Sequence, residues 1–374
     1  MIVLLEEKVR SMVEKIANIT PENTQEVQTR SVPGDAVIDV RDLRKVYAGN
    51  IEAVKGINFY VREGEFFGFL GPNGAGKSTT IKILITLLAR TSGTATILGH
   101  DVNEESTLVR RLIGYAAQEA SPDDDLTGQE NLNIQGNLYH IEPTVLKSRI
   151  EELIELMDLQ DAANRRVGTY SGGMRKRLDL ASALIHRPRI LFLDEPTTGL
   201  DPQNRAGLWK YLERLNKQEG LTIFLTTHYM EEADKLCERL AIIDGGKIIA
   251  EGSPTELKAH LGGDVITLSF KDNGTSPEFQ ATRVQEVLRD QAFVRSTTVN
   301  AEKNLTVVVE NGSEAIPLVM RLLDHEGLVV ASLSLTSPSL DDVFLKYTGT
   351  RIRQDDPVAY TPGGARGPWA RRRR

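Results

Sequence analysis

The strongest signal in this sequence is a glycine-rich run at residues 71–79, which reads GPNGAGKST. It matches the pattern G-x-x-x-x-G-K-[ST], in which a loop between a strand and a helix binds phosphate groups. Residues 66–70 before it form an apolar run typical of a buried strand, and residues 77–89 have a helical pattern. The strand–loop–helix context that the motif requires is therefore present, and the sequence predicts a phosphate site.

The residue types in this run suit the chemistry of a phosphate site. Glycines let backbone N–H groups turn toward phosphate oxygens without clashes of Cβ atoms, and the start of the helix adds the positive end of its dipole. We expect Lys77 to reach the β- and γ-phosphates of a nucleotide and the Ser78 hydroxyl to bind Mg²⁺. The candidate ligands from this run are Gly71, Asn73, Gly74, Gly76, Lys77, Ser78 and Thr79.

A second signal follows the apolar run at residues 190–193, where Asp194 and Glu195 come directly after it. Alone, two acids at the end of a strand are most often only solvated. Beside a phosphate loop they suit a nucleotide hydrolysis site. Asp194 could then hold the Mg²⁺ shell, and Glu195 could orient an attacking water and accept its proton.

Short β-rich runs alternate with helical stretches between residues 37 and 263, which predicts an α/β domain with a largely parallel sheet. Several of these runs are almost wholly apolar, as expected for strands that are buried on both faces. The candidate strands are residues 37–43, 65–70, 95–98, 113–117, 190–193, 222–226 and 240–243.

The pattern of predicted strands and helices changes after Gly262-Gly263, and residues 264–350 follow the order β-α-β-β-α-β. This is the ferredoxin-like arrangement, so we expect a small α+β domain, either regulatory and dimer-supporting or important only for stability. Its expected strands are residues 265–270, 293–299, 305–310 and 328–335, and its expected helices are 278–289 and 313–325. A last helix is expected at residues 340–347.

Both ends of the chain differ in character from these domains. Apolar residues recur at steps of three and four through residues 1–20, which predicts an amphipathic helix, and residues 21–36 are typical of a polar linker. The helix could dock on its own domain, on a partner or second copy, or on a membrane surface. Residues 351–374 are rich in Arg, Pro and Gly and predict a basic disordered tail, either simply solvated or in contact with anionic lipid.

The composition limits the setting in which the chain works. Its 45 Lys+Arg against 52 Asp+Glu give a formal net charge of −7, which argues against a general nucleic-acid binder. The single cysteine, Cys237, excludes a disulfide framework and a cysteine-based structural zinc site. No run approaches the roughly 18–20 uncharged apolar residues needed to cross a bilayer. We therefore expect a reduced, cytosolic chain whose membrane role comes through a partner.

Residues 170–178 resemble a signature motif of a known family. They read YSGGMRKRL, which is similar to the LSGGQ signature of ATP-binding-cassette (ABC) ATPases, and they precede the Asp194-Glu195 strand as in that family. The match covers about residues 37–255. It implies a cassette that uses ATP and Mg²⁺ and has a mostly parallel core sheet, an antiparallel β subdomain and a helical subdomain.

The signature departs from the family pattern at two positions. Tyr170 replaces Leu, and Met174 replaces Gln, so the polar contact of that glutamine is lost. Ser171, Gly172 and Gly173 remain. Phosphate contact through a hydroxyl, backbone amides and a helix N-terminus therefore stays chemically possible.

Four further residues match family motifs one by one. Tyr47 stands where an aromatic ring stacks on adenine, and Gln118 stands at the Q-loop, near Mg²⁺ and the transporter contact. Asp201 belongs to the D-loop, where it communicates across the dimer, caps the next helix, or does both. His228 follows a strand where the family has its switch histidine against the γ-phosphate. The resemblance thus implies Lys77, Gln118, Glu195 and His228 as catalytic residues and Ser78, Gln118 and Asp194 as Mg²⁺ ligands.

The resemblance also implies partners. One phosphate loop and one signature per chain require a second copy, in a head-to-tail homodimer closed by two ATP molecules. The transmembrane permease would be a separate chain, met by the helical subdomain that begins at residues 126–132, with this chain at the cytoplasmic face of the membrane. Residues 338–345, PSLDDVFL, resemble the tail of daunorubicin/doxorubicin-type exporter ATPases of the ABC-2 class. This implies the motor subunit of an exporter for drugs, lipids or other hydrophobic compounds.

Two alternatives stay open at this point. The first is a soluble ABC ATPase that acts on ribosomes or nucleic acid, but the ribosome-acting members usually carry two cassettes and this chain has one. The second is an importer motor, which the type of C-terminal domain disfavours and the cassette alone does not exclude.

Overall fold

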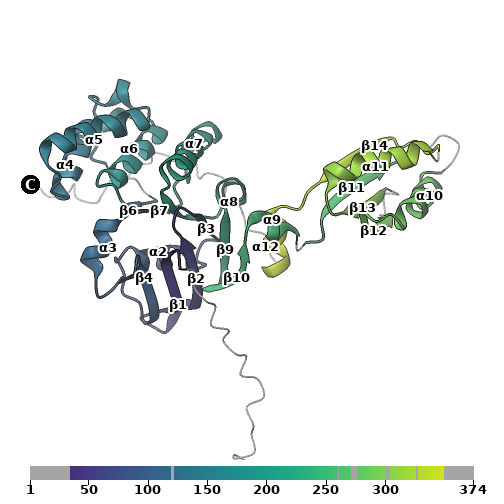
Figure 1. The fold of residues 1–374 in the computed structure, drawn as a ribbon, viewed down its shortest axis with the longest axis horizontal. Helices are drawn as coiled ribbons and strands as arrows, with labels where there is room; N and C mark the ends of the chain where they lie inside the picture. The colour runs from purple at the N-terminus through teal and green to yellow at the C-terminus, as the bar shows by residue number, and fades with distance from the viewer. Residues whose placement is uncertain are drawn as a thin grey trace, which may run out of the picture. The chain divides into compact units, whose positions relative to one another are not determined.

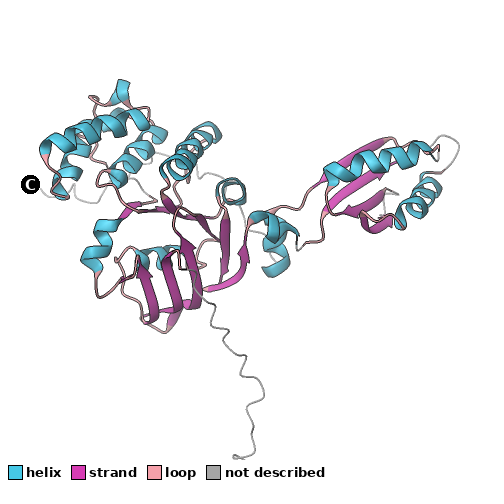
Figure 2. Cartoon of the chain, in the orientation of Figure 1, coloured by secondary structure: helices cyan, strands magenta, loops and turns pink. Residues whose placement is uncertain are grey.

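The structure of this protein is a computed structural model, and it describes residues 34–118, 122–259, 261–270, 276–299, 304–325 and 327–348. The predicted N-terminal helix (1–20), nearly all of the predicted linker (21–36) and the predicted basic tail (351–374) lie outside these residues. Figures 1 and 2 show helices packed beside a central twisted sheet and a smaller sheet further along the chain.

The central sheet has six strands in the order β10-β9-β3-β8-β7-β6 and is parallel except at β10. Every residue of β3 is buried, with Phe66 and Leu70 in one hydrophobic cluster and Phe67 and Phe69 in the other. This burial on both faces explains the continuous apolar runs of the sequence. The strands are β3 (Phe66–Leu70), β6 (Ile113–Ala116), β7 (Ile190–Asp194), β8 (Thr222–Thr227), β9 (Arg239–Asp244) and β10 (Lys247–Gly252).

A second, antiparallel sheet has the order β2-β1-β4-β5. Two of the candidate strands, 37–43 and 95–98, therefore belong to this antiparallel sheet and not to the parallel one. The family resemblance implied an antiparallel β subdomain of this kind. Its strands are β1 (Ala36–Tyr47), β2 (Ile51–Arg62), β4 (Ser92–Ile97) and β5 (His100–Asp101). β2 and β5 have no counterpart among the candidate strands.

Several of the helices begin at residues whose side chains cap them. Thr127 and Glu130 form a capping box at the start of α4, and Ser171 caps α6. α2 ends at Leu84, five residues before its predicted end, because Thr86 turns the chain with φ 67°. The helices are α2 (Lys77–Leu84), α3 (Ser106–Leu112), α4 (Gly128–Leu138), α5 (Pro143–Leu156), α6 (Gly172–Leu184), α7 (Pro202–Glu219), α8 (Met230–Leu236) and α9 (Pro254–Ala259), with 3-10 turns at Gln160–Ala162 and Val167–Thr169.

The C-terminal elements have the predicted order β-α-β-β-α-β and form an antiparallel sheet in the order β12-β13-β11-β14. α10 and α11 supply apolar side chains to one cluster with the sheet. The elements are β11 (Asp264–Ser269), α10 (Pro277–Arg289), β12 (Val294–Val299), β13 (Leu305–Val309), α11 (Gly312–His325), β14 (Ser332–Thr336) and α12 (Leu340–Thr348). The domain boundary at residues 263/264 stays a prediction.

The last helix, α12, packs against α8 and α9. Its buried residues Leu340, Val343 and Phe344 belong to the same hydrophobic cluster as the cassette strands, not to the cluster of the C-terminal sheet. The apolar stripe of α12 therefore completes the core of the cassette.

We expect Phe344→Ala to lower the free energy of unfolding by about 3–5 kcal/mol, because it removes a ring that is 2% exposed from that core. Chemical denaturation of the purified protein measures this. Tyr347→Ala, which trims a ring that is 45% exposed on the same helix, serves as the control and should change little. Equal losses of unfolding free energy in both variants would show that burial of Phe344 in the cassette core is not what stabilises the protein at α12.

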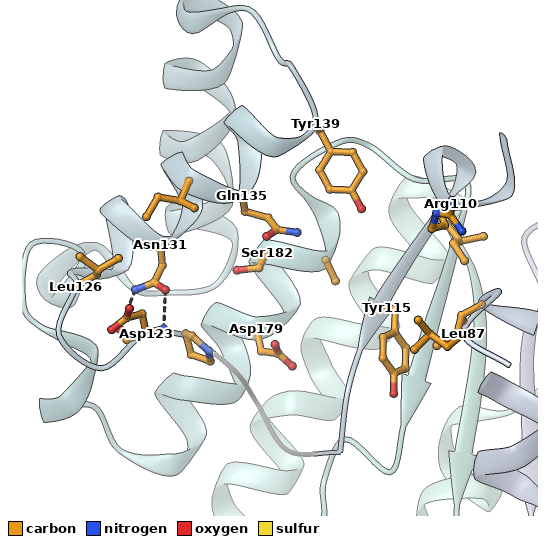
Figure 3. A pocket seen from close by; sticks show the side chains of 15 residues that line it. Leu87, Arg110, Tyr115, Asp123, Leu126, Asn131, Gln135, Tyr139, Asp179 and Ser182 are labelled. Carbon is orange, nitrogen blue, oxygen red and sulfur yellow. Dashed lines mark hydrogen bonds between the residues drawn. The ribbon is translucent and has the colours of Figure 1, made fainter. Parts of the chain in front are cut away.

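A cleft of about 510 Å³ opens between the parallel sheet and the helical subdomain formed by α4, α5 and α6 (Figure 3). Its lining combines exposed apolar side chains with polar ones from α3, β6, α4 and α6. These residues include Leu87, Arg110, Tyr115, Asp123, Leu126, Asn131, Ile134, Gln135, Tyr139, Asp179 and Ser182. None of the helices in the described ranges is long and apolar enough to span a membrane.

Candidate functional site

The phosphate loop leaves the end of β3 and enters α2, as predicted. Gly76 has φ 108°, and a Cβ added there would lie 2.7 Å from the Ala53 carbonyl oxygen. A Cβ on Gly71 would lie 2.2 Å from the Ile243 carbonyl oxygen. Side chains at these two positions would push the loop off the neighbouring strands, which is why glycine is needed. Asn73 and Gly74 lie exposed at the tip of the loop.

The ammonium group of Lys77 is almost wholly buried at the base of this loop. It donates hydrogen bonds to the carbonyl oxygens of Gly71 (2.7 Å) and Pro72 (3.0 Å) and lies 3.0 Å from Glu195 Oε1. Lys77 therefore connects the phosphate loop to the two acids at the end of β7.

The two predicted acids point to different neighbours. Asp194 Oδ1 accepts a hydrogen bond of 2.6 Å from the Thr226 hydroxyl of β8. The backbone N–H of Glu195 is bonded to Thr226 as well, through the hydroxyl and the carbonyl oxygen. Glu195 has φ 47°, a left-handed conformation that is uncommon for a residue other than glycine. Such strain is typical of positions held in place for chemistry.

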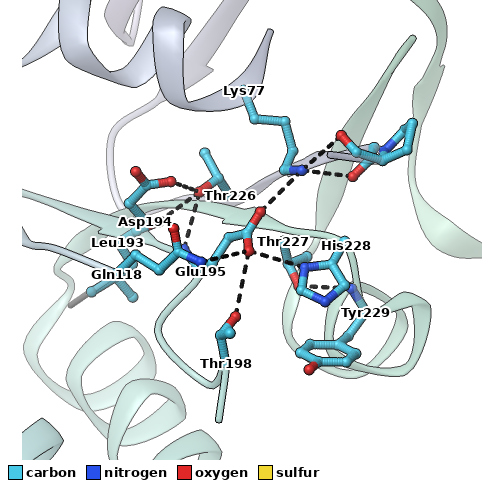
Figure 4. A network of polar contacts seen from close by, with 12 residues as sticks. Lys77, Gln118, Leu193, Asp194, Glu195, Thr198, Thr226, Thr227, His228 and Tyr229 are labelled. Carbon is cyan, nitrogen blue, oxygen red and sulfur yellow. Dashed lines mark hydrogen bonds and ion pairs between the residues drawn. The ribbon is translucent and has the colours of Figure 1, made fainter. Parts of the chain in front are cut away.

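Four side chains converge on the carboxylate of Glu195 (Figure 4). Lys77 meets Oε1, and His228 Nδ1 lies 3.0 Å from Oε2. Gln118 and Thr198 each donate to Oε2 over 3.4 Å. Burial alone would raise the pKa of Glu195, but His228 and Lys77 outweigh it and hold that pKa at about 2. At neutral pH the group is an ionised carboxylate, able to accept a proton.

Tyr47 ends β1 beside the phosphate-loop helix. Its hydroxyl lies 3.4 Å from the Thr79 hydroxyl, and its ring is 40% exposed. An exposed ring face at this position is what stacking on a nucleobase requires.

The signature residues lie at the start of α6. The Ser171 hydroxyl caps the helix by accepting from Met174 N–H, and a Cβ on Gly173 would lie 2.4 Å from Asn204 Oδ1. Asp201 caps α7 by accepting from Asn204 N–H, so the capping interpretation of Asp201 holds. Among the described residues, no hydrogen bond or ion pair joins the signature residues to Lys77 or Glu195. Gly173 of the signature instead lies close to Asn204 of α7 in its own chain.

Lys176 is a residue that the sequence analysis missed. Its buried amine donates to the carbonyl oxygens of Ala117 and Gln118, so the signature helix holds the backbone on which Gln118 stands. The signal for it was present: Lys176 lies on the buried face of α6 together with Gly173 and Leu180. A lysine in an apolar helical stripe needs a partner of its own.

The predicted Mg²⁺ ligands have suitable chemistry. Ser78, Gln118 and Asp194 offer a hydroxyl, an amide and a carboxylate oxygen, the hard donors that Mg²⁺ prefers. No group of three or more His, Cys, Asp or Glu residues suited to a metal occurs within the described ranges.

Comparison with known protein families gives two matches. The family described as "ABC transporter" matches residues 54–198, and "ATP-binding protein DrrA1-3-like, C-terminal domain" matches residues 252–348. The first covers the phosphate loop, the signature and the Asp194-Glu195 strand. The second covers the ferredoxin-like elements and α12.

Several curated proteins align along most of the chain. The daunorubicin resistance ATP-binding protein DrrA3 of Streptomyces coeruleorubidus is 41% identical, over 84% of this chain and 96% of that protein. The doxorubicin resistance ATP-binding protein DrrA of Mycobacterium tuberculosis is 40% identical, over 84% and 94%. The Nod factor export ATP-binding protein I of Burkholderia lata is 38% identical, over 85% and 99%. Each is named for resistance to a compound or for export of one, as expected for relatives of an exporter ATPase.

Solved structures agree in fold over the cassette. CbiO1 from Clostridium perfringens, part of the ABC transporter complex cbiONQ, has a TM-score of 0.57 and 26% identity, over 61% of this chain and 92% of that one. The dimeric cassette MJ0796, described in a post-hydrolysis state bound to ADP and Pi, has a TM-score of 0.53 and 28% identity, over 58% and 98%. The chain therefore belongs to the family of ATP-binding subunits of ABC transporters, the ATPase family that its phosphate loop and signature predicted.

Proposed function

We propose that this chain hydrolyses ATP to drive a separate membrane permease that exports a hydrophobic compound. The observation that carries the proposal is the convergence of Lys77, Gln118 and His228 on the ionised carboxylate of Glu195, beside the phosphate loop. The drug-resistance names of the relatives supply the class of compound.

Each side chain of this cluster has one task in the proposed reaction. Lys77 binds phosphate oxygens, and Ser78 and Asp194 hold Mg²⁺, which neutralises phosphate charge when bound. Glu195 orients a water and accepts its proton, and His228, bonded to Glu195, faces the γ-phosphate. Tyr47 stacks on the adenine. These groups act mainly by positioning and by stabilising charge, as phosphoryl transfer requires.

The second copy enters the proposal through the signature. The first turn of α6 exposes Ser171 and Gly172, with free backbone amides at a helix N-terminus that suits phosphate. Because this turn makes no polar contact with Lys77 or Glu195 in the described part of its own chain, it is available to the nucleotide of another copy. A head-to-tail pair would then contain two composite sites.

The permease would dock in the cleft between the sheet and the helical subdomain, which puts the chain at the cytoplasmic face of the membrane. Leu87 and Ile134 line this cleft and are 66% and 50% exposed, and Arg110 and Asp123 lie beside them (Figure 3). Exposed apolar groups rimmed by charges fit an amphipathic segment of a partner. The lining residues Tyr115 and Pro122 stand on either side of Gln118 in the chain, so a docked segment could influence the site through this stretch.

We expect Ile134→Glu to abolish copurification with a co-expressed permease that binds the unmodified chain, because it buries a charge in an apolar contact. Co-expression followed by pull-down in detergent measures this. Val145→Glu, at a residue that is 56% exposed in the same subdomain but does not line the cleft, serves as the control and should leave the complex intact. Loss of the complex in both variants, or in neither, would remove the cleft from the proposal. Vesicles with the intact complex then test ATP-dependent efflux of anthracycline drugs.

A further inference from the structure

A chain of ring contacts joins His228 to the helix that follows the D-loop. The ring centroids of His228 and Tyr229 lie 4.1 Å apart, and Figure 4 shows the two rings together. The guanidinium carbon of Arg205 lies 4.1 Å from the centroid of Tyr229. Arg205 stands in the first turns of α7, whose N-cap is Asp201 of the D-loop.

The guanidinium group of Arg205 contacts this aromatic ring and also interacts electrostatically with Glu232. Its Nε is buried and has no hydrogen-bond partner among the residues that the structure describes. A guanidinium group stacks well on an aromatic face, where its planar charge meets the negative face of the ring. Tyr229 thus contacts the cation of α7 as well as the imidazole.

A second contact ties the same two segments together one helical turn further on. Trp209 follows Arg205 by four residues and donates from Nε1 to Glu232 Oε1 over 3.0 Å, with both side chains buried. Burial raises the pKa of Glu232, and hydrogen bonds from Thr227 and Trp209 oppose this shift. Residues four apart share a helix face. α7 therefore contacts residues 228–232, the segment that begins with His228, at two points along one face.

Given the function proposed above, we infer that Tyr229, held by Arg205, is a positioning residue that keeps the imidazole of His228 aimed at Glu195. Among the residues that the structure describes, His228 has one side-chain polar contact, from Nδ1 to Glu195, which does not by itself fix the plane of the ring. The ring of Tyr229, tilted by 39° with its centroid 4.1 Å away, packs against the imidazole and restricts that plane. The contacts of Tyr229 with Arg205 and His228 also connect α7, which follows the D-loop, with the switch histidine of the same chain.

The test compares steady-state ATP hydrolysis by the full chain with its permease. We expect Tyr229→Leu to lower kcat about tenfold while KM for MgATP stays within about twofold, since only alignment is lost. Tyr229→Phe keeps the ring and should restore kcat. Arg205→Gln removes the guanidinium group that contacts the Tyr229 ring and should lower kcat roughly threefold, again without a change in KM.

A double variant separates positioning from a general structural effect. If Tyr229 acts through His228, adding Tyr229→Leu to His228→Ala should cost no further activity, whereas independent effects would multiply. Losses that multiply, or a Tyr229→Leu enzyme with normal kcat, would overturn the inference. Should Tyr229→Leu fail to fold, normal kcat in Arg205→Gln overturns it as well. If His228→Ala alone has normal kcat, the proposed role of His228 fails first, and the two failures are thereby distinguished.

Discussion

Replacing Glu195 with glutamine should lower kcat for ATP hydrolysis by roughly 10²–10⁴-fold, the usual contribution of a positioned general base. Glutamine has the same shape, and its one carbonyl oxygen can still accept a hydrogen bond from Lys77 while its NH2 group replaces Oε2 beside His228, so nucleotide affinity should change little. What it loses is the ability to take a proton from water. The ATP-bound dimer should then accumulate, because it opens only after hydrolysis.

The pKa of Glu195 bears on this expectation in two ways, because it keeps the carboxylate ionised but makes it a weaker proton acceptor than an ordinary glutamate. Its pKa of about 2 lies below the ordinary glutamate value near 4.3. A depressed carboxylate pKa contributes stability above the ordinary value and loses it as the pH falls toward the folded-state value. At neutral pH the base is therefore ionised and its contacts with Lys77 and His228 are complete.

The measurement for Glu195→Gln combines phosphate release with size-exclusion chromatography in the presence of ATP and Mg²⁺. Glu63→Gln is a suitable control, because Glu63 is an exposed acid paired with Arg189 at the surface. It should hydrolyse ATP normally and show no trapped dimer. Normal turnover by Glu195→Gln would remove Glu195 from its proposed role. A slow variant that stays monomeric with ATP would instead count against the ATP-bound dimer.

The parts of the site that sequence reasoning found are those carried by local patterns. β3 is apolar over its whole length and β7 is apolar up to Asp194, because both faces of these strands are buried, and polar residues of the site stand at the end of each. β2 was missed because its burial alternates along the strand, as on a sheet with one covered face. Alternation of buried and exposed residues is itself a pattern that predicts a strand, even where no continuous apolar run occurs.

The contacts that complete the site could not be read from the chain in the same way. Lys176 holds the carbonyl of Gln118 across 58 positions, and Trp209 meets Glu232 across 23. Such pairs depend on how helices pack, and a helix sequence alone does not say which neighbour its buried polar groups will find. The motifs therefore predicted what chemistry the site holds, while the packing shows what keeps each group in place.

Replacing Lys77 with alanine should produce the opposite defect to Glu195→Gln, a failure to bind nucleotide. Hydrogen bonds to charged groups contribute about 1.5–3 kcal/mol each, so losing the ammonium should weaken ATP binding roughly 10- to 150-fold. Fluorescent-nucleotide titration measures this. Lys82→Ala removes the same charge from an exposed position five residues along α2 and should bind ATP normally.

The buried environment of Lys77 makes a stability measurement necessary beside the titration. Alanine leaves Glu195 without the ammonium group beside Oε1, so the pKa of Glu195 should rise, and breaking a buried pair can cost about 3–5 kcal/mol of folding free energy. Lys77→Ala should therefore melt earlier than Lys82→Ala and, unlike Glu195→Gln, form no dimer with ATP. A folded Lys77→Ala protein that binds ATP as tightly as Lys82→Ala would show that the loop amides alone hold the phosphates. In that case the main task of Lys77 would be to keep Glu195 ionised.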